Sequence, residues 1–160
     1  MIEVSFYHLT RRTLDQALPV LLEKSLARGW RVAVQGSDEK RLRNLDNYLW
    51  SFDPEKFLPH GIKADGAPET QPIYLTTQSD NPNDADVRFF VDGAIAPPTL
   101  ADPASAPKAR AVLMFDGNEA AELQAARDQW KELRDAGFEV VYFQEDDSGR
   151  WEEKKREKPE

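Results

Sequence analysis

Segments with the two-residue period of a β-strand alternate with segments of helical periodicity along most of this chain. Apolar, β-branched and aromatic residues mark strands at residues 2–9, 30–35, 73–77, 86–91, 111–115 and 139–143, and helices are predicted between them at residues 14–28, 38–52 and 119–136. Because a helical crossover between neighbouring strands normally makes them parallel, this alternation predicts an α/β fold, a three-layer sandwich with a mainly parallel central sheet.

Capping residues set the ends of the predicted helices. Thr13 can cap the first helix, Gly29 ends it, and Gly137 ends the last one. Pro19 leaves two interpretations open: either the regular helix begins later than Thr13 suggests, or the proline kinks it.

The second helix leads into an apolar stretch, residues 45–61, that is also rich in turn residues. Pro54 lacks an amide hydrogen and restricts the residue before it, so the helix is expected to end near Phe52. Ordinary surface loops are polar, so Phe57, Leu58 and Pro59 are expected either to pack on the domain or to contact a partner.

Length and composition limit the possible classes of protein. The 160 residues predict one α/β domain over residues 1–146 and a charged C-terminal tail at 147–160. The tail is expected to be frayed or disordered from residue 154. Four prolines favour a surface loop at residues 94–108. The chain has no cysteine and two histidines, so it predicts no disulfide and no bound metal or cofactor. With no secretory or membrane-spanning segment, it is expected to be cytoplasmic. A formal net charge of −8 argues against a surface that binds nucleic acid as a whole.

A Rossmann-like sheet commonly binds nucleotides, but the glycine motifs for such a site are absent from this sequence. Two isolated side chains could serve an enzyme. Asp116 follows an apolar strand, although Asp116-Gly117-Asn118 is also a common turn, and His60 has no nucleophile near it in the sequence. A small α/β enzyme acting on a phosphorylated or nucleotide substrate through Asp116 and His60 therefore remains an alternative.

The helix at residues 119–136 carries a stripe of positive charge. At about 100° per residue, Arg127, Lys131 and Arg134 fall within about 60° of one another, and Leu123 and Trp130 border them on the apolar side. This arrangement suits an acidic peptide with an apolar end. Spacing alone fits an amphipathic surface helix with a core tryptophan even better.

Several short motifs are similar to those of the chi subunit of bacterial DNA polymerase III. They are Phe6-Tyr7, Asp38-Glu39-Lys40, Leu45-Asp46 through Leu49-Trp50, Phe57-Leu58-Pro59-His60, and the Arg127, Trp130-Lys131, Arg134, Ala136-Gly137-Phe138 ending of the last long helix. The likeness extends to about Phe143, is weak at residues 62–111, and does not include the charged extension after it.

This resemblance implies an accessory, non-catalytic subunit of the clamp-loader assembly in DNA replication. Such a subunit binds the acidic, phenylalanine-ending C-terminal tail of single-stranded-DNA-binding protein and reaches nucleic acid only indirectly. By the same resemblance, Arg127, Lys131 and Arg134 would receive the carboxylates of the tail, and Trp130 would wall the pocket for its terminal phenylalanine. Trp50 would belong to a surface that binds a partner, a psi subunit or the clamp loader, and Phe57 would lie near the contact with a psi subunit or with the tail. A third hypothesis, direct DNA contact through Arg11, Arg12 and residues 154–158, is weakened by the overall acidity.

Overall fold

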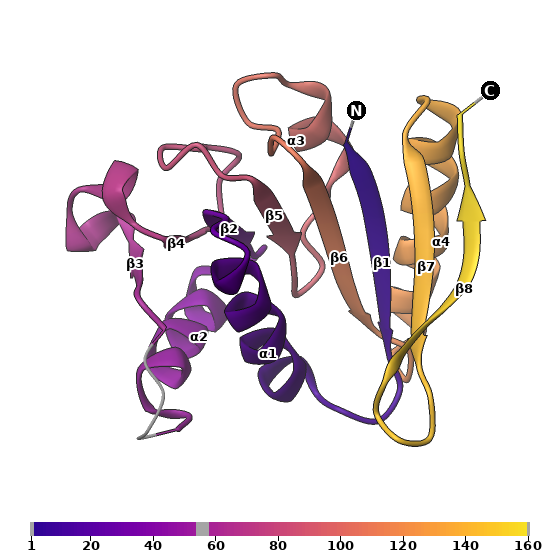
Figure 1. The fold of residues 1–160 in the computed structure, drawn as a ribbon, viewed down its shortest axis with the longest axis horizontal. Coiled ribbons are helices and arrows are strands. Elements are labelled where there is room, and N and C mark those ends of the chain that lie inside the picture. Colours follow the sequence, from indigo (N-terminus) through magenta and orange to yellow (C-terminus); the bar gives the residue numbers. More distant parts are fainter. Residues whose placement is uncertain (1, 54–57, 160) are drawn as a thin grey trace.

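The computed structural model describes residues 2–53 and 58–159, within which eight strands form one sheet (Figure 1). The strand order is β3-β4-β2-β5-β6-β1-β7-β8, and every neighbouring pair is parallel except β7 with β8. The strands are β1 (Glu3–Leu9), β2 (Val32–Gln35), β3 (His60–Ile62), β4 (Ile73–Thr76), β5 (Val87–Phe90), β6 (Arg110–Asp116), β7 (Glu139–Glu145) and β8 (Trp151–Glu157).

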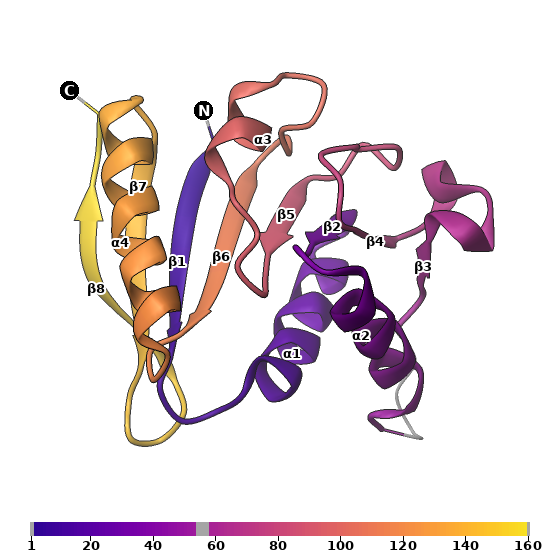
Figure 2. The same ribbon diagram turned by 180° about the vertical axis from the view of Figure 1, so that it is seen from behind.

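Helices flank the sheet on both sides (Figures 1 and 2). They are α1 (Leu14–Ala27), α2 (Glu39–Ser51), α3 (Pro97–Ala101) and α4 (Ala120–Asp135), and two short 3-10 turns, η1 (Lys63–Asp65) and η2 (Pro68–Thr70), lie between β3 and β4. The predicted α/β class with a mainly parallel central sheet is confirmed.

The core consists of two apolar clusters, one on each face of the sheet. The α1 and α2 cluster includes Leu18, Leu22 and Leu49 and packs on β2, β4 and β5. The α3 and α4 cluster includes Leu100 and Leu133 and packs on β1, β6 and β7. Side chains alternate between the faces along a strand, so β1 directs Val4 and Phe6 toward α4 and Tyr7 toward the other face.

The cap residues predicted from the sequence are in place. The Thr13 side chain accepts a hydrogen bond from the Gln16 amide, and the Gln16 side chain accepts one from the Thr13 amide, which forms a capping box. Since α1 begins at Leu14 and Pro19 lies inside it, the alternative of a later helix start is wrong. Asp38 caps α2, and the helix ends at Phe52, where its end was predicted.

Two expectations from the sequence are corrected by the structure. The proline-rich segment 94–108, expected to be a loop, contains α3, whose first positions hold Pro97 and Pro98. Proline suits the first turn of a helix because the amide hydrogen that it lacks has no partner there.

The C-terminal residues, expected to be frayed or disordered from residue 154, form β8 as far as Glu157. This strand pairs with β7 at the edge of the sheet. Charged residues are common on edge strands, where they prevent pairing with other chains.

No helix in the described part of the chain is long and apolar enough to span a membrane.

Candidate functional site

A pocket of about 380 Å³ lies between α4 and the sheet. It is lined by residues from four strands and one helix, namely Phe6, His8, Phe115, Leu123, Ala126, Arg127, Trp130, Tyr142 and Lys155. Most of these side chains are aromatic or aliphatic, so the pocket suits an apolar group.

Strand pairing brings the aromatic walls together. Phe6 and His8 point to the same face of β1, where His8 pairs in register with Phe115 of β6 and Phe6 with Tyr142 of β7. The His8 ring stacks on Phe115 with centroids 5.0 Å apart, and the Phe6 ring meets Trp130 of α4 edge-on at 5.2 Å. These contacts fix the shape of the pocket before any ligand binds.

Positive charge lies at the mouth of the pocket. Arg127 and Lys131 are exposed on α4, and within residues 2–53 and 58–159 neither side chain forms an ion pair. Lys155 reaches the same mouth from β8, with its Nζ 5.8 Å from the centroid of the Trp130 ring. The site therefore combines an apolar interior with cations that an anionic group can approach.

A histidine and a tyrosine form a polar pair within the pocket. The Nδ1 atom of His8 is hydrogen-bonded to the hydroxyl of Tyr142. Burial lowers the pKa of His8, nearby Asp116 raises it, and Arg127 lowers it further. Burial also raises the pKa of Tyr142, which Arg127 partly offsets.

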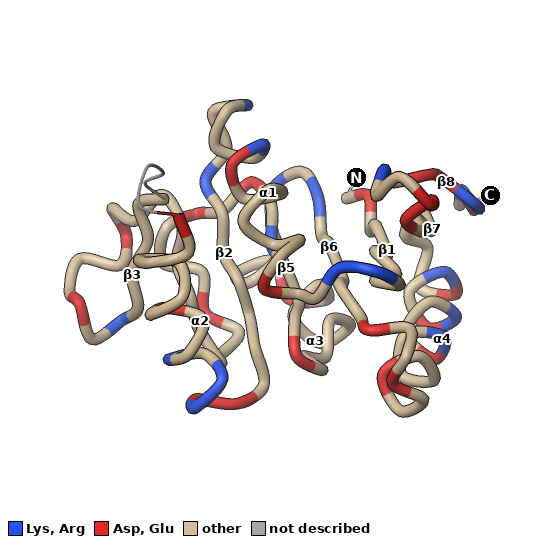
Figure 3. Tube along the Cα trace, turned by 90° about the horizontal axis from the view of Figure 1, so that it is seen from below, with Lys and Arg blue, Asp and Glu red and all other residues tan. Residues whose placement is uncertain are grey.

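Carboxylates gather at the opposite, amino-terminal end of α4. Burial raises the pKa of Glu122, a hydrogen bond with the Asp116 backbone lowers it, and the charges of Asp116, Asp92 and Glu119 raise it. Figure 3 shows acidic residues at the start of α4 and basic residues, interspersed with acidic ones, farther along it. The acidic residues at the start of α4 therefore disfavour an anion at that end of the helix.

The structure brings together part of the predicted α4 stripe at the pocket. Arg127 and Trp130 line it, and Lys131 is exposed on the next turn. Arg134 does not line the pocket, because its guanidinium forms ion pairs with Asp135 at 3.2 Å and with Glu157 of β8 at 3.6 Å.

The predicted partner surface lies at the other end of the molecule, beside α2 (Figure 1). The Trp50 side chain is 52% exposed, and its ring lies 4.2 Å from that of His60, centroid to centroid. Phe57, predicted near the contact with a psi subunit or with the tail, falls outside the described residues. Trp50 is thus separate from the α4 pocket.

His60 has a structural position. It is buried, its Nδ1 lies 2.6 Å from the Leu58 carbonyl oxygen, and its Nε2 lies 3.1 Å from a carboxylate oxygen of Asp46. Asp116 ends β6, and β4, β2 and β5 separate that strand from β3, which carries His60. The fold therefore does not bring together Asp116 and His60, the two side chains that the hypothesis of a small α/β enzyme requires.

The basic residues of the DNA hypothesis are largely paired with acidic ones. Arg12 contacts Glu145 at 2.8 Å and Arg11 contacts Asp147 at 3.7 Å. Lys154 and Lys155 pair with glutamates of β8 in the same way. This pairing reduces the charge that they can offer to phosphates.

Sequence reasoning assigned Leu123, Arg127 and Trp130 to the site and missed the other pocket residues, among them His8, Phe115, Tyr142 and Lys155. The alternation of His8 with Phe6 was the available signal for β1. Lys155 had none, because its segment was interpreted as a tail. Among the described residues, no group of three potential metal-ligating side chains comes together.

Comparison with known proteins connects this geometry to a family. The family model described as DNA polymerase III chi subunit, HolC, matches residues 1–141. The chain is 33% identical over 91 residues to the "Probable DNA polymerase III subunit chi" of Rickettsia prowazekii (strain Madrid E), an alignment that covers 57% of this chain and 55% of that protein. It is 29% identical over 141 residues to the "DNA polymerase III subunit chi" of Pseudomonas aeruginosa (strain PAO1), which covers 86% of this chain and 93% of that protein.

Proposed function

This chain belongs to the DNA polymerase III chi subunit family, whose members are accessory subunits in DNA replication, and from this premise we propose that it binds the acidic C-terminal tail of single-stranded-DNA-binding protein. In this role it acts in the cytoplasm, has no active site of its own, and reaches DNA through its protein partner.

One observation carries the proposal: an aromatic pocket opens directly beside cations that have no ion-pair partner among the described residues. Trp130 forms part of the pocket wall, and Arg127 lies at its edge. A terminal phenylalanine fits the chemistry of the interior, because its ring can pack against several aromatic rings. Its carboxylate can accept charge-assisted hydrogen bonds from the Arg127 guanidinium.

The charges of α4 also favour one direction for the peptide. Its acidic residues are repelled by Asp116 and Glu122 at the amino-terminal end of the helix and attracted by Lys131 on the next turn after Arg127. The chain of the peptide therefore runs from the pocket toward the carboxyl-terminal end of α4. There Arg134 can contribute by exchanging its partners Asp135 and Glu157 for a carboxylate of the peptide.

A second surface can hold another protein of the replication assembly. Trp50 exposes half of its large side chain at the end of α2, and exposed aromatic side chains are frequent anchors in interfaces. We assign Trp50, together with Phe57, to contact with the clamp loader or a psi subunit. The separation of this surface from α4 allows both partners to bind at once.

Calorimetric titration with an Asp-rich peptide ending in Pro-Phe tests the proposal. We expect weak to moderate binding that weakens as salt is raised, because exposed charges carry part of it. Arg127→Ala should weaken binding by about tenfold, equivalent to about 1.4 kcal/mol, and Lys131→Ala should weaken it less. Lys40→Ala, an exposed change on α2, is the matched control. No binding at low salt, or equal affinities for Arg127→Ala and the control, would refute the proposal.

A further inference from the structure

The last strand of the sheet lies beyond the part of the chain that matches the chi family model. The family model ends at residue 141, whereas β8 spans Trp151–Glu157. We propose that β8 extends the peptide site, and that its Lys155 binds a carboxylate of the acidic peptide together with Arg127. The identity of the peptide rests on the function proposed above.

An irregularity in the β7–β8 pairing places Lys155 in this position. Tyr142 pairs with Lys155, but the next residue, Phe143, pairs with Glu153, so Lys154 is an extra residue on β8. Residues directly opposite in an antiparallel pair point to the same face, and Tyr142 lines the pocket. The bulge therefore directs Lys155 to the pocket, a known use of bulges near functional sites.

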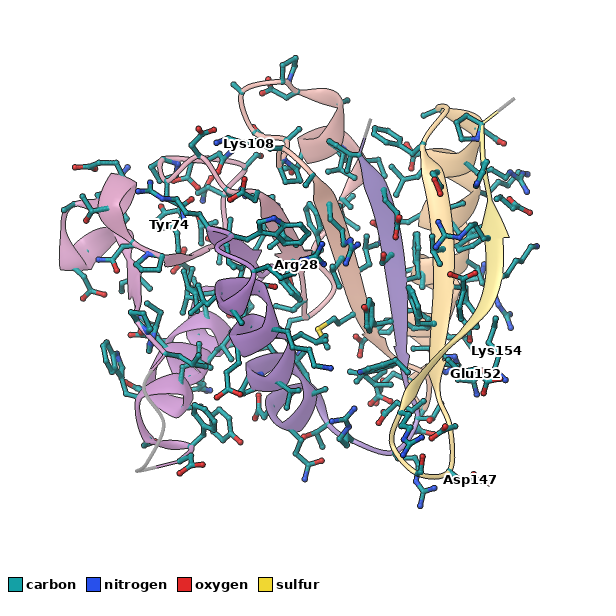
Figure 4. The ribbon with its side chains drawn as sticks, in the orientation of Figure 1. Arg28, Tyr74, Lys108, Asp147, Glu152 and Lys154 are labelled. Atoms are coloured by element: carbon teal, nitrogen blue, oxygen red, sulfur yellow. The ribbon has the colours of Figure 1, made fainter. Side chains whose placement is uncertain are left out.

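The extra residue itself is directed elsewhere. Lys154 Nζ lies 3.2 Å from a carboxylate oxygen of Glu152, and both side chains extend outward from β8 at the edge of the sheet (Figure 4). Two adjacent lysines on one strand thus have different positions. Lys155 is at the pocket, and Lys154 is a matched control for it.

Contacts on both sides of Lys155 hold β8 in place. On one side, the Trp151 ring meets the Tyr7 ring edge-on, with centroids 4.8 Å apart. On the other, Arg156 forms an ion pair of 2.6 Å with Glu139 of β7, and Glu157 contacts Arg134 of α4. A cation on a strand fixed in this way loses little conformational freedom when a ligand binds.

The Lys155 ammonium retains the capacity to bind a ligand. It pairs with Glu157 at 3.2 Å, in an exposed contact of the kind that contributes little to stability. An ammonium group has three N–H donors, so this pair leaves donors for a second carboxylate. Arg127 of α4 and Lys155 of β8 both line the pocket, and so does Trp130, whose ring centroid is 5.8 Å from Lys155 Nζ. A terminal carboxylate held between these two cations would leave the adjoining aromatic ring inside the pocket.

The test is peptide titration of the full-length chain carrying Lys155→Ala or Lys154→Ala. Lys155→Ala should weaken binding of the acidic peptide by about three- to fivefold, the range for an exposed charge pair, and Lys154→Ala should leave it unchanged. Lys155→Glu should weaken binding more than Lys155→Ala. Amidation of the peptide's C-terminal carboxylate should weaken binding to the unmodified protein more than it weakens binding to Lys155→Ala.

A second substitution should improve binding. Glu157→Gln removes the carboxylate that competes for Lys155, and the peptide should then bind about twofold more tightly. In a Lys155→Ala background this gain should shrink. Because Glu157 also pairs with Arg134, part of the gain can persist in that background. A gain of the same size in both backgrounds would overturn the role of Lys155.

The outcomes separate this inference from the proposed function. Equal affinities for Lys155→Ala and Lys154→Ala, with Arg127→Ala still weakened, would overturn the role of β8 and leave the proposed function intact. Absence of peptide binding to the unmodified protein at low salt would overturn both.

Discussion

The His8 imidazole lies against the backbone of Gly117, in the space that a Cβ atom at position 117 would occupy. Such an atom would be 1.6 Å from Nε2 of His8, far inside contact distance. The Gly117 amide also donates a 2.9 Å hydrogen bond to the Leu9 carbonyl, which holds the two strand ends together. The turn after β6 therefore requires glycine because of His8, and His8 in turn forms a wall of the pocket.

The first prediction concerns Gly117→Ala. The new methyl group must displace the His8 ring from its stack on Phe115, and we expect the free energy of unfolding to fall by about 1–3 kcal/mol, the usual cost of overpacking. Denaturant unfolding measures the loss, and peptide titration should show weaker binding. In the control Gly36→Ala, the added methyl group meets only Leu42 at an ordinary contact distance of 3.7 Å, so this loss should be clearly smaller. Similar losses in the two variants would contradict the steric argument.

The pH dependence of stability should report the environment of His8. Because its pKa is lowered in the folded chain, the unfolded chain binds a proton at a higher pH than the folded one. The contribution of His8 to stability is therefore fully present above about pH 6.5, the ordinary pKa of a histidine side chain, and is lost as the pH falls through the lowered pKa. Urea unfolding over this pH range measures the effect, and His8→Gln should flatten the profile.

Arg127→Ala tests whether the Arg127 guanidinium contributes to the lowered pKa of His8. The guanidinium lowers the pKa of His8, so its removal should raise that pKa while leaving the larger effect of burial. An NMR titration of the His8 ring protons would show the change. A pKa that stays the same in Arg127→Ala would mean that the guanidinium and the imidazole do not interact.

A third prediction concerns a buried arginine outside the pocket. Arg88 of β5 has no exposed surface, and burial lowers its pKa to about 10. It donates hydrogen bonds to the Gln35 side chain and to the carbonyls of Gln78 and Asp80. Arg88→Met would remove the donor to both carbonyls and leave the buried Gln35 oxygen with only the Thr99 hydroxyl, so we expect a loss of about 3 kcal/mol in chemical unfolding. Arg31→Met, a change at an exposed arginine, should cost much less.

The fourth prediction is that the two proposed partner surfaces are independent. Trp50→Ala should leave the peptide affinity unchanged, because α2, which carries Trp50, lies at the opposite end of the molecule from α4 (Figure 1). In a pull-down from native extract, the same variant should lose the clamp-loader proteins and keep single-stranded-DNA-binding protein. Arg127→Ala should show the reverse. Loss of both partners from both variants would contradict separate surfaces.

The sequence predicted the fold wherever local pattern decided the structure. Thr13, Asp38 and the glycines at helix ends act within a few residues, so the helix boundaries followed from them. It failed for β8, because Glu152 to Arg156 are all charged and resemble a solvated tail. Their strand conformation comes from pairing with β7 and from the packing of Trp151, neither of which is encoded locally.

The same distinction applies to the site. Helical spacing alone placed Arg127 and Trp130 near one another, since both lie on α4. The rest of the pocket comes from residues far apart in sequence, such as His8 and Tyr142, which only the order of the strands brings together. Spacing also could not reveal that Arg134 is paired with Glu157, since that partner lies on the unpredicted strand.

The last prediction tests how β8 is attached. Trp151 is partly buried against Tyr7 and lies beneath the guanidinium of Arg12, whose carbon is 5.6 Å from the centroid of the Trp151 ring. Trp151→Ala removes this apolar contact, and we expect the free energy of unfolding to fall by roughly 2 kcal/mol. Amide hydrogen exchange should increase in β8, whose only neighbour in the sheet is β7.

Exchange should change far less in α1, which contacts another part of the sheet. Trp151→Phe keeps an aromatic ring in place and should largely preserve protection of the β8 amides. If exchange in β8 were the same in Trp151→Ala and the unmodified protein, the pairing with β7 and the ion pairs, chiefly that of Arg156 with Glu139, would suffice to hold the strand.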